Sequence, residues 1–393
     1  PLGADNIKEM KELMGWENED FFVSQDVYTN METYIANGEK AEQEWNELFS
    51  KYEEAYPELA SEYKKWHELD VTDELLNDKD FWKFEKGCAT RQASGDVLNR
   101  LTSFIPNLMG GSADLAPSNK SDMKNTGFFS KEDRSGQNIH FGVREHAMAA
   151  ITNAIAAHGG LKAYCATFFV FSDYMKGAMR LSALMNLPVT YILTHDSIGV
   201  GEDGPTHQPI EQLAALRSLP NMTVFRPADS NETAAAWFYA VTNKTTPTSL
   251  VLTRQNLPLY DIDGKVALKG AYILKDSQKE TPDVILMASG SEVELIMGAA
   301  DELAKKGIDA RVVSMPSFEL FEAQSAEYKE SVLPNAVRNR VAVEAASSFG
   351  WYKYVGLDGE VIALDHFGAS APASILFKEF GFTVENVVET ALR

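Results

Sequence analysis

The chain contains little cysteine and comparatively little positive charge. Its 393 residues include two cysteines, Cys88 and Cys165, which are too few and too far apart for a disulfide framework or a cysteine-based zinc site. Lysine and arginine number 36 against 57 acidic residues, so the net charge is −21, and no basic cluster occurs. We therefore expect no nucleic-acid partner, because nucleic-acid-binding proteins need a basic surface.

Long apolar runs are also absent from the sequence. No stretch approaches the length of a membrane span, and the first residues lack the basic-then-apolar order of a signal peptide. We expect a cytoplasmic protein without a membrane partner. Hydrophobic residues make up 45% of the chain and charged residues 24%, which is ordinary for a globular protein.

Residues 1–85 are acidic and rich in tryptophan, tyrosine and glutamate. Large apolar side chains recur there at steps of three or four residues, which indicates a long amphipathic helix. They are Trp45, Phe49, Tyr52, Tyr56, Leu59, Tyr63 and Trp66. Pro57 should kink or divide this helix, unless it begins a second one. We predict a helical connector over residues 1–85 and give it no catalytic role.

From residue 86 onward, short β-branched runs alternate with helical patterns. Strands are predicted at 163–168, 189–194, 223–225 and 249–253, and again at 284–288, 310–314, 341–344 and 361–364. Such alternation favours parallel sheets covered on both faces. The expected fold is therefore α/β, with two doubly wound, mainly parallel-sheet domains at 86–260 and 283–393. Residues 261–282 are expected to be a linker between them.

The most informative motif is THDSIGVGEDGPTHQP at residues 194–209, directly after a predicted strand. Its glycines allow tight turns and close approach to a ligand. His195, Asp196, Asp203 and His207 place ionisable groups in the same segment, where histidine can bind phosphate or move protons. We interpret the motif as a substrate-handling loop. The alternative is a polar loop whose histidines cap backbone groups, and the spacing matches no zinc signature.

Other strand exits carry side chains of similar chemistry. Glu145 begins a predicted helix, where it either complements the helix dipole or directs a carboxylate into a cleft. Phe168, Phe171 and Tyr174 are either core aromatics or a wall on which a flat heterocycle stacks. Further candidates are Asp114, Ser118, Arg91 and Arg254. Arginine suits phosphate recognition, although each of these residues is also common in ordinary ion pairs.

The motifs ATRQAS, GGSADLAPSN, FGVREHAM, ATFFVFSDY, the 194–209 loop, FRPAD and LTRQNLP follow one another in this order. Together they resemble transketolase, an enzyme family that uses thiamine diphosphate. The resemblance covers essentially the whole chain and is loosest in the connector. It implies reversible transfer of a two-carbon ketol unit from a ketose phosphate to an aldose phosphate, through the cofactor ylid.

The resemblance also implies roles for individual residues. Glu145 would bond the aminopyrimidine ring of the cofactor and His207 would contact the transferred ketol end, both as catalytic residues. Asp203 would sense a sugar hydroxyl. The remaining cofactor contacts would be Asp114, Leu115, Phe168, Phe171 and Tyr174, and the remaining sugar-phosphate contacts Arg91, Ser118, His195 and Arg254.

One family motif is missing. Transketolases bind the diphosphate through a divalent metal, Mg or Ca, on an N-terminal domain with a GDG motif, and no GDG occurs here. We therefore expect this chain to lack that domain, to hold no metal itself and to be inactive alone, within a family of homodimers. Dihydroxyacetone synthase and a non-catalytic dimerisation or binding module stay open as alternatives. The complete 194–209 loop argues against 1-deoxyxylulose-5-phosphate synthase.

Overall fold

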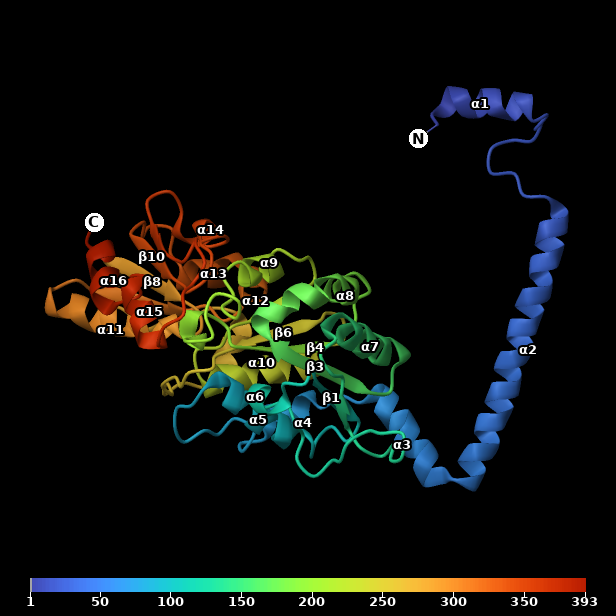
Figure 1. Cartoon of the computed structure of the whole chain (residues 1–393), viewed down its shortest axis with the longest axis horizontal. Coiled ribbons are helices and arrows are strands. Elements are labelled where there is room, and N and C mark those ends of the chain that lie inside the picture. Colours follow the sequence, from blue (N-terminus) through green and yellow to red (C-terminus); the bar gives the residue numbers. More distant parts are fainter. Residues whose placement is uncertain (1) are drawn as a thin grey trace. The chain divides into compact units, whose positions relative to one another are not determined.

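The computed structural model describes residues 2–393 (Figure 1). The chain divides into two compact units, residues 1–65 and residues 66–393. Within the described residues, none of the helices combines the length and the apolar character needed to cross a membrane.

The first unit is helical. Its helices are α1 (Ala4–Leu13), α2 (Gln25–Ala55) and the first part of α3 (Pro57–Glu68). α2 ends just before Pro57 and α3 begins there, since proline has no N–H for a continuing helix but suits a first turn. The predicted division at Pro57 is therefore confirmed. The Phe49 ring lies 6.0 Å from Trp45 and 5.4 Å from Tyr63, yet α2 buries none of its residues.

The second unit contains a six-stranded parallel sheet in the order β2-β1-β3-β4-β6-β5 (Figure 1). Its strands are β1 (Leu108–Ser112), β2 (Asn138–His140), β3 (Lys162–Phe168), β4 (Thr190–Thr194), β5 (Thr223–Phe225) and β6 (Thr248–Leu252). The accompanying helices are α4 (Thr72–Asn77), α5 (Thr90–Leu101), α6 (Ala116–Asn119), α7 (Glu145–His158), α8 (Ser172–Leu184), α9 (Gln212–Arg217) and α10 (Ser230–Thr242).

Helices cover both faces of this sheet. Alternate side chains of β4 enter different cores: Ile192 packs with residues of α5 and α10, while Tyr191 and Leu193 pack with residues of α7 and α8. Every residue of β4 is buried, as expected for a central parallel strand covered on both sides. β1 was not among the predicted strands, because its glycines weaken the pattern. Glycine is needed at position 111, since a Cβ there would lie 1.8 Å from the Ile139 carbonyl oxygen.

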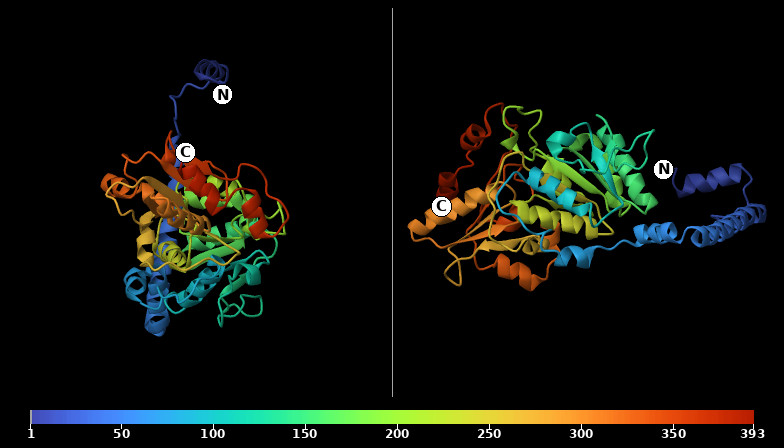
Figure 2. Two further views of the ribbon diagram at one scale, coloured as in Figure 1. Left: turned by 90° about the vertical axis from the view of Figure 1, so that its left-hand side faces the viewer. Right: turned by 90° about the horizontal axis from the view of Figure 1, so that it is seen from below.

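The second sheet has five strands in the order β11-β10-β8-β9-β7. Figure 2 shows this part of the chain in orange to red. The strands are β7 (Tyr272–Lys275), β8 (Val284–Ala288), β9 (Ala310–Ser314), β10 (Arg340–Val343) and β11 (Glu360–Ile362). Its helices are α11 (Glu292–Lys305), α12 (Phe318–Glu322), α13 (Ala326–Val332), α14 (Tyr352–Val355), α15 (Ala373–Glu379) and α16 (Val384–Ala391). The doubly wound α/β class predicted from the sequence is thus present in both sheets.

The segment 261–282 differs from the expected linker. It contains a 3-10 helix, η3 (Gly264–Lys269), and strand β7, which pairs antiparallel with β9 at the edge of the second sheet. Gly270 joins the two with a φ of +82°, and Tyr272 is buried. The linker expectation is corrected here: a short edge strand flanked by polar turns gives too weak a pattern to be found from sequence alone.

Candidate active site

The candidate site lies where the strands of the first sheet end. Phe168 and Thr194 are paired neighbours at the ends of β3 and β4. His195 follows with a φ of +64°, a left-handed conformation that is uncommon for histidine. Its imidazole stacks on the Phe168 ring, with 3.7 Å between centroids. Adjacent strands thus bring together an aromatic and a histidine that are separate motifs in the sequence.

Hydrogen bonds determine which ring nitrogen of His195 carries the proton. Thr194 Oγ1 donates to Asn119 Oδ1 at 2.7 Å, so the same oxygen is left to accept from His195 Nδ1 at 2.8 Å. Nε2 is then the unprotonated nitrogen, and Arg91 Nη1 donates toward it at 3.4 Å. Burial, followed by the positive charges of Arg91 and Arg254, lowers the pKa of His195 to about 3. His195 is therefore a neutral acceptor at physiological pH.

Arg91 and Arg254 form a positive centre beside His195. Thr90 and Thr253 exchange hydrogen bonds at 2.7 and 3.0 Å, which holds the start of α5 against the end of β6. Arg91 also donates to the Ser118 carbonyl at 2.8 Å. Burial and the neighbouring Arg254 lower the pKa of Arg91. Neither arginine has an acidic partner within residues 2–393, which leaves both available to an anion.

An aromatic wall continues from Phe168. Phe171 stacks parallel to Phe168 at 5.9 Å, and Tyr174 follows at 6.0 Å. The His207 ring stands edge-on to this wall, 5.5 Å from Phe171 and 6.4 Å from Phe168. Phe168 is nearly buried, whereas Tyr174 is 66% exposed. The wall therefore runs from the core to solvent and offers ring faces to a flat ligand.

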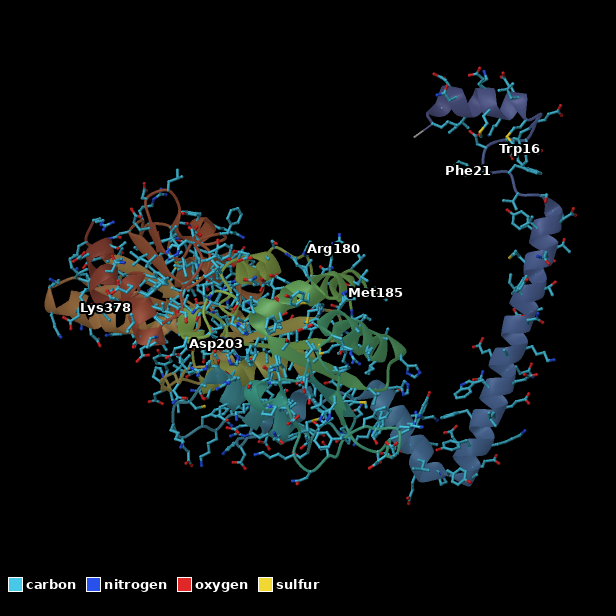
Figure 3. The ribbon with its side chains drawn as sticks, viewed as in Figure 1. Trp16, Phe21, Arg180, Met185, Asp203 and Lys378 are labelled. Carbon is cyan, nitrogen blue, oxygen red and sulfur yellow. The ribbon has the colours of Figure 1, made fainter. Side chains whose placement is uncertain are left out.

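The other predicted residues are placed less closely. Asp203 is exposed on the loop after β4 and is labelled in Figure 3. Asp114 is exposed with a φ of +62°, and the half-buried Leu115 donates its N–H to Ser112 Oγ. Glu145 is the half-buried first residue of α7. Ser118 contributes its carbonyl to Arg91, not its hydroxyl.

Metal binding has no clear location in the described residues. Among residues 2–393, no group of three or more His, Cys, Asp or Glu side chains is arranged to hold an ion. The side chains of Glu145 and Asp203 make no hydrogen bond or ion pair within residues 2–393. Both carboxylates are therefore open to a ligand, but neither is in a cluster.

A buried charge cluster adjoins the site and was missed in the sequence. Arg226, directly after β5, donates to Asp196 at 2.9 Å, to Glu292 at 2.5 Å and to the Ser289 carbonyl at 2.8 Å. Glu344 lies 3.8 Å from Arg226. Because Asp196 follows His195, the cluster ties the site to the second sheet. Arg226 was visible only as part of FRPAD, and nothing local indicates its partners.

Three family models match the chain. "Transketolase, pyrimidine binding domain" matches residues 86–259, and "Transketolase-like TK C-terminal domain" matches residues 270–383. "Transketolase, thiamine diphosphate binding domain" matches residues 1–70. The chain belongs to the transketolase family.

Individual relatives agree with this assignment. A Bacillus subtilis protein named transketolase is 55% identical over 99% of this chain and 59% of its own length. A Pichia stipitis transketolase structure in complex with sedoheptulose 7-phosphate is 44% identical, with a TM-score of 0.86, covering 100% of this chain and 58% of its own. A structure described as a split-gene transketolase, inactive beta4 tetramer, is 24% identical (TM-score 0.63, covering 78% of this chain and 98% of its own) and shows the fold alone.

The match at residues 1–70 corrects one expectation. We expected the family's diphosphate-binding domain to be missing from this chain, but the helical segment 1–70 belongs to that domain's pattern. The absence of GDG is no evidence against the rest of that domain, because one short motif stands for only a small part of it. The chain spans about three fifths of the length of the curated relatives that it matches.

Proposed function

We propose that the chain forms part of a thiamine diphosphate-dependent transketolase that moves a two-carbon ketol unit from a ketose phosphate to an aldose phosphate. The observation that carries this proposal is the positive centre of Arg91 and Arg254, which adjoins neutral His195 and the aromatic wall. An anionic group and a flat ring would thus find matching partners at neighbouring strand ends. In open α/β sheets this is the edge where ligands bind.

The sugar phosphate would lie against the positive centre. Arg91 and Arg254 would bind the phosphate, and Ser118 would help to orient Arg91 through its carbonyl. His195 Nε2 would accept from a sugar hydroxyl once the Arg91 guanidinium turned toward the phosphate. His207, held edge-on to Phe171, would contact the ketol end, and exposed Asp203 would sense a hydroxyl configuration.

The residues at the wall fit the aminopyrimidine ring of the cofactor. Phe168, Phe171 and Tyr174 present ring faces with increasing exposure, and the Glu145 carboxylate has no competing partner. We assign Glu145 to hold a proton shared with a ring nitrogen, and Asp114 and Leu115 to neighbouring contacts. When bound, thiamine diphosphate supplies the electron sink that stabilises the two-carbon unit.

A homodimer is part of the proposal. Apolar side chains of the second unit remain exposed on α7, on α8 and beside them, which is typical of an interface. They are Val143, Ile151, Leu181, Leu184 and Met185, and Figure 3 labels Met185 with Arg180. A divalent metal, Mg or Ca, for the diphosphate, a cytoplasmic location and a place in the pentose phosphate pathway are further proposals. Inactivity of the 393-residue chain alone stays a prediction.

The test supplies the part of a full-length relative that this chain does not span as a separate polypeptide. Thiamine diphosphate with Mg²⁺ is titrated calorimetrically into the chain, with and without that polypeptide. We expect cofactor binding and turnover of sedoheptulose 7-phosphate in the mixture. Absence of both, with the two polypeptides folded and associated, would favour the non-catalytic module.

Glu145→Gln tests the catalytic assignment in the same mixture. The amide keeps the shape of the carboxylate but cannot hold the proton. We expect exchange of the cofactor C2 proton, followed by NMR, to slow by about 100-fold or more, the usual scale of a lost proton-transfer group. Unchanged exchange with unchanged cofactor affinity would remove Glu145 from this role.

A further inference from the structure

The loop of residues 197–209, which carries Asp203 and His207, is anchored at both ends in the domain of the second sheet. Ile198 and Ile210 are buried in a cluster with residues of β8, α11 and α15. The Ile210 carbonyl accepts the N–H of Ser347 at 3.0 Å. The loop therefore leaves the first sheet, borders the second domain and returns.

Gln208 makes a third connection. It is 2% exposed, and its Nε2 donates at 2.9 Å to the Gly201 carbonyl within the loop and at 2.9 Å to the Ala369 carbonyl in the second domain. Both hydrogens of the amide are thus in use. Oε1 faces Gly368, where a Cβ would lie 1.7 Å away. Glycine at 368 is what leaves room for the Gln208 side chain.

Ser370 holds the tip of the loop. Its hydroxyl donates to the Glu202 carbonyl at 2.5 Å. Gly204 is so close that a Cβ there would lie 3.2 Å from Ser370 Cβ. The residues on either side of Asp203 are therefore both in contact with Ser370, and the residue after His207 is bonded to Ala369.

We propose that Gln208 and the segment 368–370 form a latch through which the C-terminal domain positions Asp203 and His207. Surface loops of this length are ordinarily mobile, and a binding group held within a narrow range of positions loses less entropy when its ligand arrives. The latch residues act through the loop, so they are positioning residues. Their part in substrate binding rests on the proposed function, but the positioning itself does not.

The latch is tested by NMR of ring-labelled histidines in the 393-residue chain. The His207 ring signals carry ring-current shifts from Phe171 and Phe168, and the His195 ring, stacked on Phe168, is an internal reference. In Gln208→Met, a variant of similar volume without donors, we expect the His207 signals to move toward those of an exposed histidine. Gly368→Ala, which displaces the Gln208 side chain, should give the same result, and His195 should not change in either.

Gln324→Met is the matched control, because Gln324 Nε2 also donates to a backbone carbonyl, that of Leu320 at 2.8 Å. It should leave His207 unchanged. Unchanged His207 signals in both Gln208→Met and Gly368→Ala would overturn the proposal, as would an equal movement of His195. If either variant fails to fold, Ser370→Ala replaces it, since this change removes only one exposed hydroxyl. The proposal then requires the backbone amide signals of Asp203 and Gly204 to shift.

Calorimetric titration with sedoheptulose 7-phosphate, in the presence of the complementing polypeptide, connects the latch to function. We expect Gln208→Met to weaken binding about tenfold, since the one hydrogen bond that it removes between the loop and the second domain corresponds to roughly one such step. Failure of the unaltered protein to bind would count against the proposed function and leave the histidine shifts standing. Unaltered affinity despite shifted His207 signals would show that the latch does not position the residues for this ligand.

Discussion

Two arginines of the second unit have opposite surroundings. Arg226 is fully buried and lies among Asp196, Glu292 and Glu344. Burial alone would lower its pKa, but these three carboxylates together raise it. Arg91 is half-buried, with a histidine, a carbonyl and a second arginine for neighbours, and its pKa is lowered.

The difference separates a charge that is paired within the fold from a charge that, on the proposed function, binds a ligand. A buried arginine with three acids around it has its charge neutralised within the fold, so removing it leaves carboxylates that are costly to bury. An arginine beside another cation has no ion pair in the fold, and on the proposed function it forms one when an anion binds. Stability and ligand affinity should therefore respond in opposite ways at the two positions.

The largest effect is expected from Arg226→Met. It leaves Asp196 and Glu292 without their cation, and breaking a buried pair on one side costs about 3–5 kcal/mol. Urea unfolding, followed by circular dichroism, measures the free energy of unfolding. The control is Arg338→Met, whose ion pair with Asp358 is exposed and should contribute at most about 1 kcal/mol. Equal losses of unfolding free energy in Arg226→Met and Arg338→Met would contradict the structural role of the buried charge cluster.

A smaller effect, on binding and not on folding, is expected from Arg91→Met. Affinity for sedoheptulose 7-phosphate should fall roughly 10- to 100-fold, because a hydrogen bond to a charged group contributes about 1.5–3 kcal/mol. The free energy of unfolding should stay within about 0.5 kcal/mol, since no acid loses its partner. Arg134→Met removes the same charge from an exposed position and should change neither quantity. A large loss of stability in Arg91→Met would show that Arg91, like Arg226, stabilises the fold.

Much of the sheet architecture and of the candidate site could be predicted from the sequence, because the signals are local. The strands at 284–288 and 310–314 match β8 and β9, and the loop after β4 is marked by its glycines and histidines. Phe168, His195 and Arg91 belong to separate motifs, and only their order along the chain suggested that they belong together. Their contact follows from the pairing of β3 with β4 and of α5 with the end of β6.

The contacts that join distant parts of the chain, such as those of Arg226, could not be predicted in the same way. Arg226 reaches Asp196 across 30 residues and Glu292 across 66, and no local period links such positions. The left-handed backbone of His195 is likewise invisible, since histidine seldom adopts it. β7 was missed because a short edge strand flanked by polar turns has a weak pattern, and its partner β9 lies beyond a complete strand and helix. A motif can be recognised in consecutive residues, whereas a contact between residues far apart in the sequence cannot.

The last effect, which is spread over several pH units, tests neutral His195, which lies beside Arg91 and directly before Asp196 in the sequence. His195 is 3% exposed, and its pKa is lowered from 6.5 to about 3. As the pH falls, the unfolded chain binds this proton first, so the stability due to neutral His195 is complete above about pH 6.5 and is lost toward pH 3. The slope is about 1.4 kcal/mol per pH unit in this window. His195→Gln, which cannot be protonated, should remove it.

The measurement is the free energy of unfolding of both proteins at several pH values from 7 to 4.5. Other groups also titrate in this range, so the quantity to compare is the difference in unfolding free energy between the unaltered chain and His195→Gln. This difference should shrink as the pH falls, because only the unaltered chain loses the stability due to neutral His195. His158→Gln, at the exposed end of α7, gives the effect of losing a histidine that is not buried. A difference for His195→Gln that stays constant with pH would mean that the folded protein tolerates a charge at His195, and the positive centre of Arg91 and Arg254 would then not exclude a third cation.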